Sequence, residues 1–244
     1  MERFHKYLGS LETLTETTVT GDKKNDFYIH PALKNTGCLT LVMIREAIAP
    51  VIFRNAEQEI TDIEFNNETY IRAVPNKFKF IEKGRGLQIL RAYQVGGKLP
   101  QNKTVLRKNQ KPSEAYDLNT LVFGDSAVQD NRILPVRTAV NYSDGISLLP
   151  KQMCVDESFH NRAMEDGTLF DAESKKNSDN LFTRFFILPE TLMIQVLSTR
   201  GKVLPLEGLD HLLLSMGLAG AYGGQTSTTG VNIRSRFVGV YGSQ

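Results

Sequence analysis

The residues best suited to chemistry form a run of basic side chains in the first half of the chain. Between Asn76 and Lys111 there are ten basic residues and one acid, Glu82, so this segment carries a charge of +9. The net charge of the chain is only +2, so the rest carries −7. A basic block on an acidic body is typical of a surface that binds a polyanion. A solvated lysine-rich loop is the alternative. The basic residues are Lys77, Lys79, Lys83, Arg85, Arg91, Lys98, Lys103, Arg107, Lys108 and Lys111.

A glycine-rich turn near the C-terminus is the second candidate, in the stretch "GLAGAYGGQTSTTGVNIRSRFVGVYG". Gly223 and Gly224 let the backbone approach a ligand closely, and Gln225, Thr226 and Ser227 offer amide and hydroxyl groups to phosphate oxygens. The turn is not a P-loop, because no lysine lies near it and the helix precedes it instead of following it. A flexible loop before a solvent-facing strand is the alternative interpretation.

The strand expected after this turn carries two arginines. Side chains alternate along a strand, so Asn232, Arg234 and Arg236 are expected on one face, with Val231 and Ile233 on the other. Two guanidinium groups beside a glycine turn would suit a phosphate backbone.

Motifs for catalysis or metal binding are mostly missing. None of the four histidines is paired at metal-ligand spacing, and Cys154 with His160 gives two of the four ligands of a structural zinc site. Ser126 is not a nucleophile elbow, because Val128 stands where glycine is needed. His211 lies on an expected helix and is interpreted as a partly buried core residue. We expect no metal and no cofactor.

The order of elements indicates an α+β fold in a single domain, residues 1–244. Residues 39–44 are expected to form a strand buried on both faces, and residues 84–97 a short helix. Residues 76–116 are predicted as a basic insertion and 150–180 as an inserted lid or thumb. Further strands are expected at 51–55, 61–65, 69–75, 132–143, 181–189, 192–199 and 231–242, with a last helix at 206–220.

Composition places the chain among globular proteins. Apolar residues make up 41% and charged residues 23% of its 244 positions. No apolar run is long enough to cross a bilayer, and the polar N-terminus lacks a signal core. Two cysteines in a chain of this length indicate reduced thiols, so a cytoplasmic location is expected and no membrane partner.

Five stretches, in their order along the chain, resemble one family. They are "LTLVMIREAIAPVIFRNAEQEITDI", "YIRAVPNKF", "GLQILRAY", "LNTLVFGDSAV" and "GLAGAYGGQTSTTGVNIRSRFVGV". The chain resembles the CRISPR-associated RAMP backbone subunits, in particular the type I-D Cascade subunit called Csc-two. The resemblance spans residues 39–240.

The resemblance implies a modified ferredoxin-like (RRM-like) core with inserted loop or thumb subdomains. It implies a ribonucleoprotein role in antiviral defence, in which many copies bind guide RNA without base specificity and present it to a target DNA strand. Expected partners are guide RNA, target DNA, further copies of the chain, and the large, small and cap subunits. Carried over by position, the implied RNA-binding residues are Arg45, Arg54, Lys77, Lys79, Gly223, Gly224, Gln225 and Thr226, beside the Lys83, Arg85, Arg91, Ser227, Arg234 and Arg236 proposed above.

Two other functions stay open. Some related backbone subunits cut their target with a loop aspartate, so Asp125 in "FGDSA" is the candidate acid of a metal-dependent nuclease that cuts at regular intervals. A module whose basic block meets an acidic protein is the third hypothesis. The absence of a catalytic motif favours a non-enzymatic RNA-binding subunit.

Overall fold

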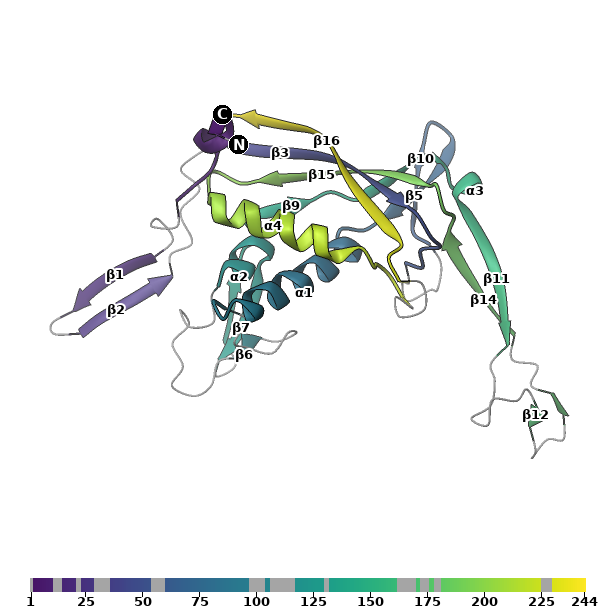
Figure 1. The fold of residues 1–244 in the computed structure, drawn as a ribbon, viewed down its shortest axis with the longest axis horizontal. Coiled ribbons are helices and arrows are strands. Elements are labelled where there is room, and N and C mark those ends of the chain that lie inside the picture. The colour runs from purple at the N-terminus through teal and green to yellow at the C-terminus, as the bar shows by residue number, and fades with distance from the viewer. Residues whose placement is uncertain are drawn as a thin grey trace.

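The computed structural model describes residues 2–10, 15–20, 23–28, 36–53, 60–96, 104–105, 117–129, 132–161, 170–171, 176–177, 181–224 and 230–244. Its main sheet has seven strands in the order β16-β3-β15-β10-β5-β4, with β9 also pairing with β15 (Figure 1). In chain order these are β3 (Cys38–Ala47), β4 (Asp62–Phe65), β5 (Glu68–Ala73), β9 (Val140–Tyr142), β10 (Gly145–Pro150), β15 (Leu192–Thr199) and β16 (Ile233–Ser243).

The core of the fold has a ferredoxin-like topology. The elements β3, α1 (Asn76–Ala92), β10, β15, α4 (Leu206–Ala219) and β16 follow one another as β-α-β-β-α-β. Every pairing among these four strands is antiparallel, and β16 lies beside β3, β3 beside β15, and β15 beside β10. The predicted α+β fold with a ferredoxin-like core is confirmed.

Alternate side chains of strand β3 point to opposite faces of the sheet, and the two sets differ in burial. Leu39, Leu41 and Met43 are fully or almost fully buried in the core, together with Leu209 and Leu212 of α4. The helices α1, α2 (Leu118–Phe123) and α4 lie together on this side, below the sheet in Figure 1. The alternate side chains of β3 are only half-buried, so the prediction of a strand buried on both faces is wrong.

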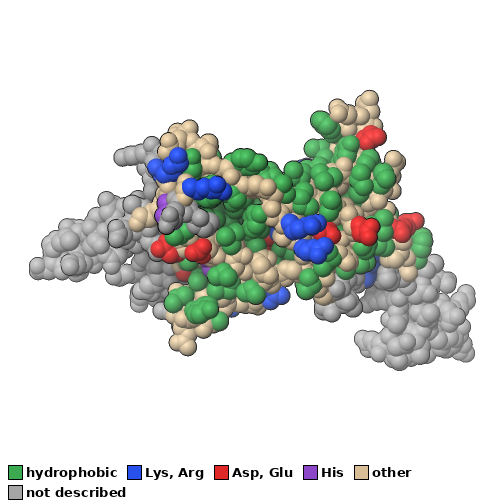
Figure 2. All heavy atoms as spheres, turned by 45° about the horizontal axis from the view of Figure 1, so that its top comes forward, with side chains coloured by type: hydrophobic (Ala, Val, Ile, Leu, Met, Phe, Trp, Pro, Cys, Tyr) green, Lys and Arg blue, Asp and Glu red, His purple; other side chains and the backbone are tan. Residues whose placement is uncertain are grey.

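The other face of the sheet carries no helix among the described elements. Ile44, Ile194 and Ile146 lie in one cross-strand row on it, and Ile194 is exposed. Figure 2 shows hydrophobic side chains gathered over this side of the molecule, with scattered basic and acidic side chains among them. This face is therefore an apolar surface open to solvent.

Helix α1 is longer than predicted and belongs to the core. It begins directly after Pro75, and its buried side is a single row four residues apart: Phe78, Glu82, Gly86 and Leu90. Residues 76–92 of the predicted basic insertion are thus the first core helix and not an insertion. The described residues of 93–116 include β6 (Thr104–Val105), which pairs with β7 (Asp125–Gln129); β7 also pairs with β8 (Arg132–Val136).

Gly86 sets how closely the helices pack. A Cβ atom there would overlap the side chain of Asn119 in α2 and would lie 2.7 Å from Nε2 of His211 and from Oγ of Ser215, both in α4. His211 is buried, and its Nε2 hydrogen-bonds to Oδ1 of Asn119 at 3.0 Å, which confirms its predicted core position. Three helices therefore meet at one residue without a side chain.

Some of the other predicted strands and helices are confirmed, and others are wrong. The strands at β14 (Leu181–Ile187), β15 and β16 and the helix α4 are confirmed. The predicted strand at 51–55 is wrong over its described part, which makes one bridge from Val51 to Ile187. The predicted strand at 132–143 is two strands, β8 and β9.

The predicted lid or thumb at 150–180 lies between the second and third core strands. It begins with α3 (Lys151–Cys154) and β11 (Val155–Asn161), which pairs with β14. Five more short elements are described outside the core: η1 (Glu2–Tyr7), the hairpin β1 (Thr15–Thr20) with β2 (Lys23–Tyr28), and the pair β12 (Phe170–Asp171) with β13 (Lys176–Asn177). No helix in the described ranges is long and apolar enough to cross a membrane.

Candidate nucleic-acid interface

A groove of about 740 Å³ lies where α1 meets the glycine turn that follows α4. It joins residues that are about 140 positions apart in the sequence. Its described lining includes three lysines and no acid. The lining residues are Val74, Asn76, Lys77, Lys79, Phe80, Ile81, Lys83, Phe123, Gly223 and Gly224. Five of the residues predicted to bind RNA therefore share one concave surface.

The three lysines come from the first two turns of α1. Lys79 and Lys83 are one turn apart, so both lie on the same side of the helix. Nζ of Lys83 donates a hydrogen bond to the carbonyl oxygen of Gly124 at 2.8 Å. Nζ of Lys79 lies 5.9 Å from the centre of the Tyr142 ring. The ammonium groups of Lys79 and Lys83 thus each lie close to a group of the protein.

Burial changes the electrostatics of these lysines. It lowers the pKa of Lys79 to about 8, with a smaller contribution from the charge of Lys83. Burial also lowers the pKa of Lys77. A shift in this direction means that the folded protein disfavours the positive charge at these positions. An anion bound in the groove would restore the charged form, so the site suits a phosphate group.

The glycine turn is held rigidly at its base. The side chain of Asn232 accepts a hydrogen bond from the amide of Tyr222 and donates one to its carbonyl oxygen, both at 2.8 Å. The amide of Gly224 donates to the carbonyl oxygen of Ile52 at 2.7 Å. Gly223 has a φ of +85°, and a Cβ atom there would overlap that carbonyl. Only glycine fits this position without strain.

A buried ion pair lies beneath the groove. Nη2 of Arg45 lies 2.8 Å from Oε1 of Glu82 in α1, and both side chains are completely buried. Tyr142 and Tyr222 donate hydrogen bonds to the two oxygens of Glu82, at 2.6 Å and 2.9 Å. Burial raises the pKa of both tyrosines, and the charge of Glu82 raises it further. Both phenols therefore stay protonated as donors.

This geometry overturns the predicted contact of Arg45 with RNA. Its guanidinium donates to Gln195 at 3.0 Å and to Ser235 at 2.6 Å, and it lies 4.8 Å from the centre of the Phe78 ring. Burial is the largest single influence and acts to lower its pKa, but Glu82, Tyr222 and Tyr142 together outweigh it, so the net shift of the pKa is upward. Arg45 is a charged core residue that joins β3 to α1 and, through Tyr222, to the glycine turn.

Comparison with known proteins supplies the family. A family profile described as Csc2 CRISPR matches residues 38–244, which is most of the chain. The chain belongs to the Csc2 CRISPR family. No curated protein is significantly similar to it in sequence.

Solved structures share the fold of this Csc2-family chain. The crystal structure of Thermofilum pendens Csc2 superposes with a TM-score of 0.58 at 15% identity, over 100% of this chain and 73% of that one. A chain of a type IV-B CRISPR complex gives 0.54 at 13%, over 84% and 93%. A chain of a CRISPR RNA-guided surveillance complex gives 0.50 at 11%, over 80% and 66%. At these identities the likeness shows the fold.

The two arginines of β16 in this Csc2-family chain lie away from the groove. Arg234 and Arg236 are exposed and both bind Glu46 of β3, at 2.9 Å and 2.7 Å. Glu46 follows Arg45, so its side chain points to the opposite face of the sheet. The hydrogen bond from Arg234 is the main cause that lowers the pKa of Glu46. The predicted grouping with Asn232 is wrong, because Asn232 is buried.

The remaining predicted residues are scattered. Arg85 donates to Gln88 on α1 at 2.8 Å, and Arg91 is exposed at the end of that helix. Neither lines the groove. Arg54, Gln225, Thr226 and Ser227 lie outside the described residues. Asp125 opens β7, directly after Gly124; its side chain is not described. In the described part of the chain, no group of three or more His, Cys, Asp or Glu side chains could hold a metal ion.

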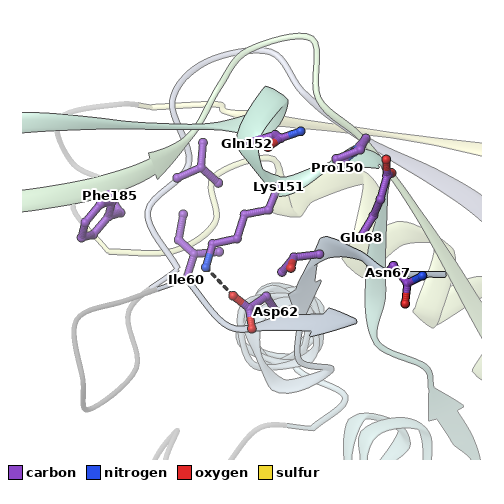
Figure 3. A pocket seen from close by; sticks show the side chains of 10 residues that line it. Ile60, Asp62, Asn67, Glu68, Pro150, Lys151, Gln152 and Phe185 are labelled. Carbon is purple, nitrogen blue, oxygen red and sulfur yellow. Dashed lines mark hydrogen bonds and ion pairs between the residues drawn. The ribbon is translucent and has the colours of Figure 1, made fainter. Parts of the chain in front are cut away.

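Sequence reasoning missed a second cavity of about 750 Å³ between the β4–β5 hairpin and α3 (Figure 3). Lys151 and Asp62 point toward one another across it and form an ion pair. The phenol of Tyr70 donates to Glu68 at 3.2 Å, and Phe185 forms part of the apolar wall. Because its lining contains two carboxylates and one lysine, this cavity does not suit a phosphate backbone.

Proposed function

We infer that this chain is a backbone subunit of a Cascade-type CRISPR interference complex. In this role it binds guide RNA in several copies, without base specificity and without cutting it, and presents the RNA for pairing with target DNA. The observation that carries the proposal is the convergence of Lys77, Lys79 and Lys83 with Gly223 and Gly224 in one groove. Membership of the Csc2 CRISPR family supports it.

The chemistry of the groove supports backbone contacts over base readout. A lysine ammonium is a compact point charge that attracts phosphate without reading a base, and the two glycines add no side chain that would keep the RNA backbone away from the groove wall. Asn76, the first residue of α1, also lines the groove, so the positive end of the helix dipole lies there. Phosphate contacts give affinity for any sequence, and base pairing of the guide supplies specificity.

The open sheet face supports assembly with protein partners. Ile194 and Tyr241 are among its exposed hydrophobic side chains, and large apolar patches on a protein surface mark interaction sites. Further copies of the chain and the large, small and cap subunits are the partners that the proposal assigns to such surfaces.

The test is fluorescence anisotropy of the purified chain with single-stranded RNAs of unrelated sequence across a salt series. We expect similar affinity for each RNA and a steep loss with salt. The Lys77→Ala/Lys79→Ala variant should bind more weakly, and its log–log salt slope should fall by up to roughly 1.4, about 0.7 for each lost phosphate contact. The matched control is Arg3→Ala/Lys6→Ala, which removes two exposed charges from η1.

Two results would overturn the proposal. Absence of RNA binding by the unaltered chain at low salt would leave the interaction module with an acidic protein partner. Magnesium-dependent shortening of the RNA or of a paired target, abolished by Asp125→Ala, would establish the nuclease alternative.

A further inference from the structure

One of the large apolar side chains that line the groove is mostly exposed to solvent. Phe80 is 60% exposed, although it belongs to a core helix. The buried row of α1 contains Phe78 and Glu82, and Phe80 lies midway between them in sequence, so it points to the outer side of the helix. An exposed phenyl ring gains nothing from the core. Its exposure within the groove leaves the ring free to contact a ligand with an apolar surface.

The neighbours of Phe80 define that ligand. Residues three apart are neighbours on a helix surface, so Lys77, Phe80 and Lys83 form one continuous row. All three line the groove. At 1.5 Å per residue, the two lysines are about 9 Å apart along the helix axis, with the ring between them. A flat aromatic surface flanked by two cations matches a nucleobase flanked by phosphates.

We propose that Phe80 stacks on one unpaired RNA base, so that the groove selects single-stranded RNA over duplex RNA. This inference rests on the proposed function of the groove. Bases inside an A-form duplex stack on each other and hide their faces, so a ring on the protein reaches a base only in a single strand. Every base has a π-face, so stacking adds affinity without sequence preference. It also leaves the Watson–Crick edge of the stacked base free to pair.

The test compares Phe80→Ala with the control Phe65→Ala. Phe65 ends β4 and is 64% exposed, so both substitutions remove an equally exposed ring. The ligands are a single-stranded RNA, the blunt duplex of the same sequence, and an abasic oligomer of the same length. We expect Phe80→Ala to weaken single-strand binding by roughly tenfold and to leave abasic binding and the salt slope unchanged. Phe65→Ala should change none of these.

A spectroscopic readout separates stacking from a change of shape. With 2-aminopurine placed along the RNA, binding of the unaltered chain and of Phe80→Tyr should quench one or more positions, and Phe80→Ala should not. Equal single-strand affinity of Phe80→Ala and the unaltered chain, or an equal loss with the abasic oligomer, would overturn the stacking role while the lysine variants still define the groove. Failure of the unaltered chain to bind any RNA would overturn the proposed function itself.

Discussion

Arg45 and Glu46 are adjacent in β3 and bind partners on opposite faces of the sheet. Arg45 pairs with Glu82 of α1 in the core, and Glu46 holds Arg234 and Arg236 on the open face. Two adjacent residues of one strand thus belong to a buried ion pair under the groove and to an exposed cluster of Glu46, Arg234 and Arg236 that lies outside the groove. This division makes the roles of the two sets of charges separable by experiment.

Breaking the buried pair should destabilise the fold. Glu82→Gln keeps the shape of the side chain but leaves Arg45 charged and unpaired in the core. We expect the free energy of unfolding to fall by about 3 to about 5 kcal/mol in denaturant titrations. Asp62→Asn, which breaks the exposed pair with Lys151, should cost less than about 1 kcal/mol.

A second variant tests whether the charge is the cause. In an Arg45→Met background no guanidinium remains to be paired, so Glu82→Gln should cost much less than it does alone. Equal costs in both backgrounds would show that the pair contributes no coupling.

Neutralising the exposed arginines should affect RNA binding little. In Arg234→Ala/Arg236→Ala we expect an affinity within about twofold of the unaltered chain and an unchanged salt slope, because both arginines pair with Glu46 and the groove lies elsewhere. Lys77→Ala/Lys79→Ala removes the same formal charge and should lower the affinity strongly. If the arginine variant loses more affinity than the lysine variant, RNA follows the open face of the sheet.

Binding should depend on pH through Lys79. Its pKa lies at about 8 in the free protein, and a bound phosphate favours the charged ammonium, so binding takes up a proton above that pH. Affinity should therefore fall from about pH 8 to about pH 9, by at most about tenfold per pH unit. Lys79→Arg keeps its charge throughout and should remove this dependence. A pH profile unchanged by Lys79→Arg would contradict the assignment.

The same shift has the opposite sign for folding. The unfolded chain holds the Lys79 proton up to about its ordinary pKa of 10.5, whereas the folded protein releases it at about 8. The unfolded state therefore binds more protons in this window, and the Lys79 contribution to stability rises with pH from about 8 to about 10.5. Chemical denaturation of the chain and of Lys79→Gln across this range would isolate the contribution.

Two glycines at positive φ allow a matched test of the turn. Gly230→Ala introduces a Cβ into open space at a φ of +62°, so only the backbone conformation is penalised, by about 1 kcal/mol. Gly223→Ala adds an overlap with the carbonyl of Ile52 at a φ of +85°. We expect it to cost more than about 2 kcal/mol and to weaken RNA binding. Similar stability and affinity in both variants would show that the close approach to Ile52 is unimportant.

The elements that could be predicted from sequence are those whose local pattern agrees with their burial. Helix α4 has apolar residues at helical spacing, and β15 alternates buried and exposed positions between turn signals. The start of α1 was missed, and the buried row of the helix contains Glu82 and Gly86, a charged residue and a residue without a side chain that no apolar pattern marks as core. Each is buried for a reason that appears only in three dimensions: the ion pair with Arg45, and the close contact with α2 and α4.

Part of the groove lining could be predicted from the sequence. Clustered lysines and paired glycines identified both of its walls, and family resemblance placed them near RNA. Sequence could not show that Arg45 points inward, because strand alternation gives two faces without saying which one the helices cover. Phe80 was overlooked, because an aromatic residue in an apolar-basic stretch reads as core until the helix phase is known.

Gly86 also limits how the groove can change between related proteins. The absence of a side chain there fixes the distance of α1 from its neighbours, while Lys77 and Lys79, which line the groove, lie about two turns or more away and are not packed in that contact. The packing of α1 and the two lysines at its start are therefore set by different positions of one helix. Single substitutions can alter the charge or aromatic content of the groove and keep the helix in place, whereas a change at Gly86 would move every groove-lining side chain of α1 at once.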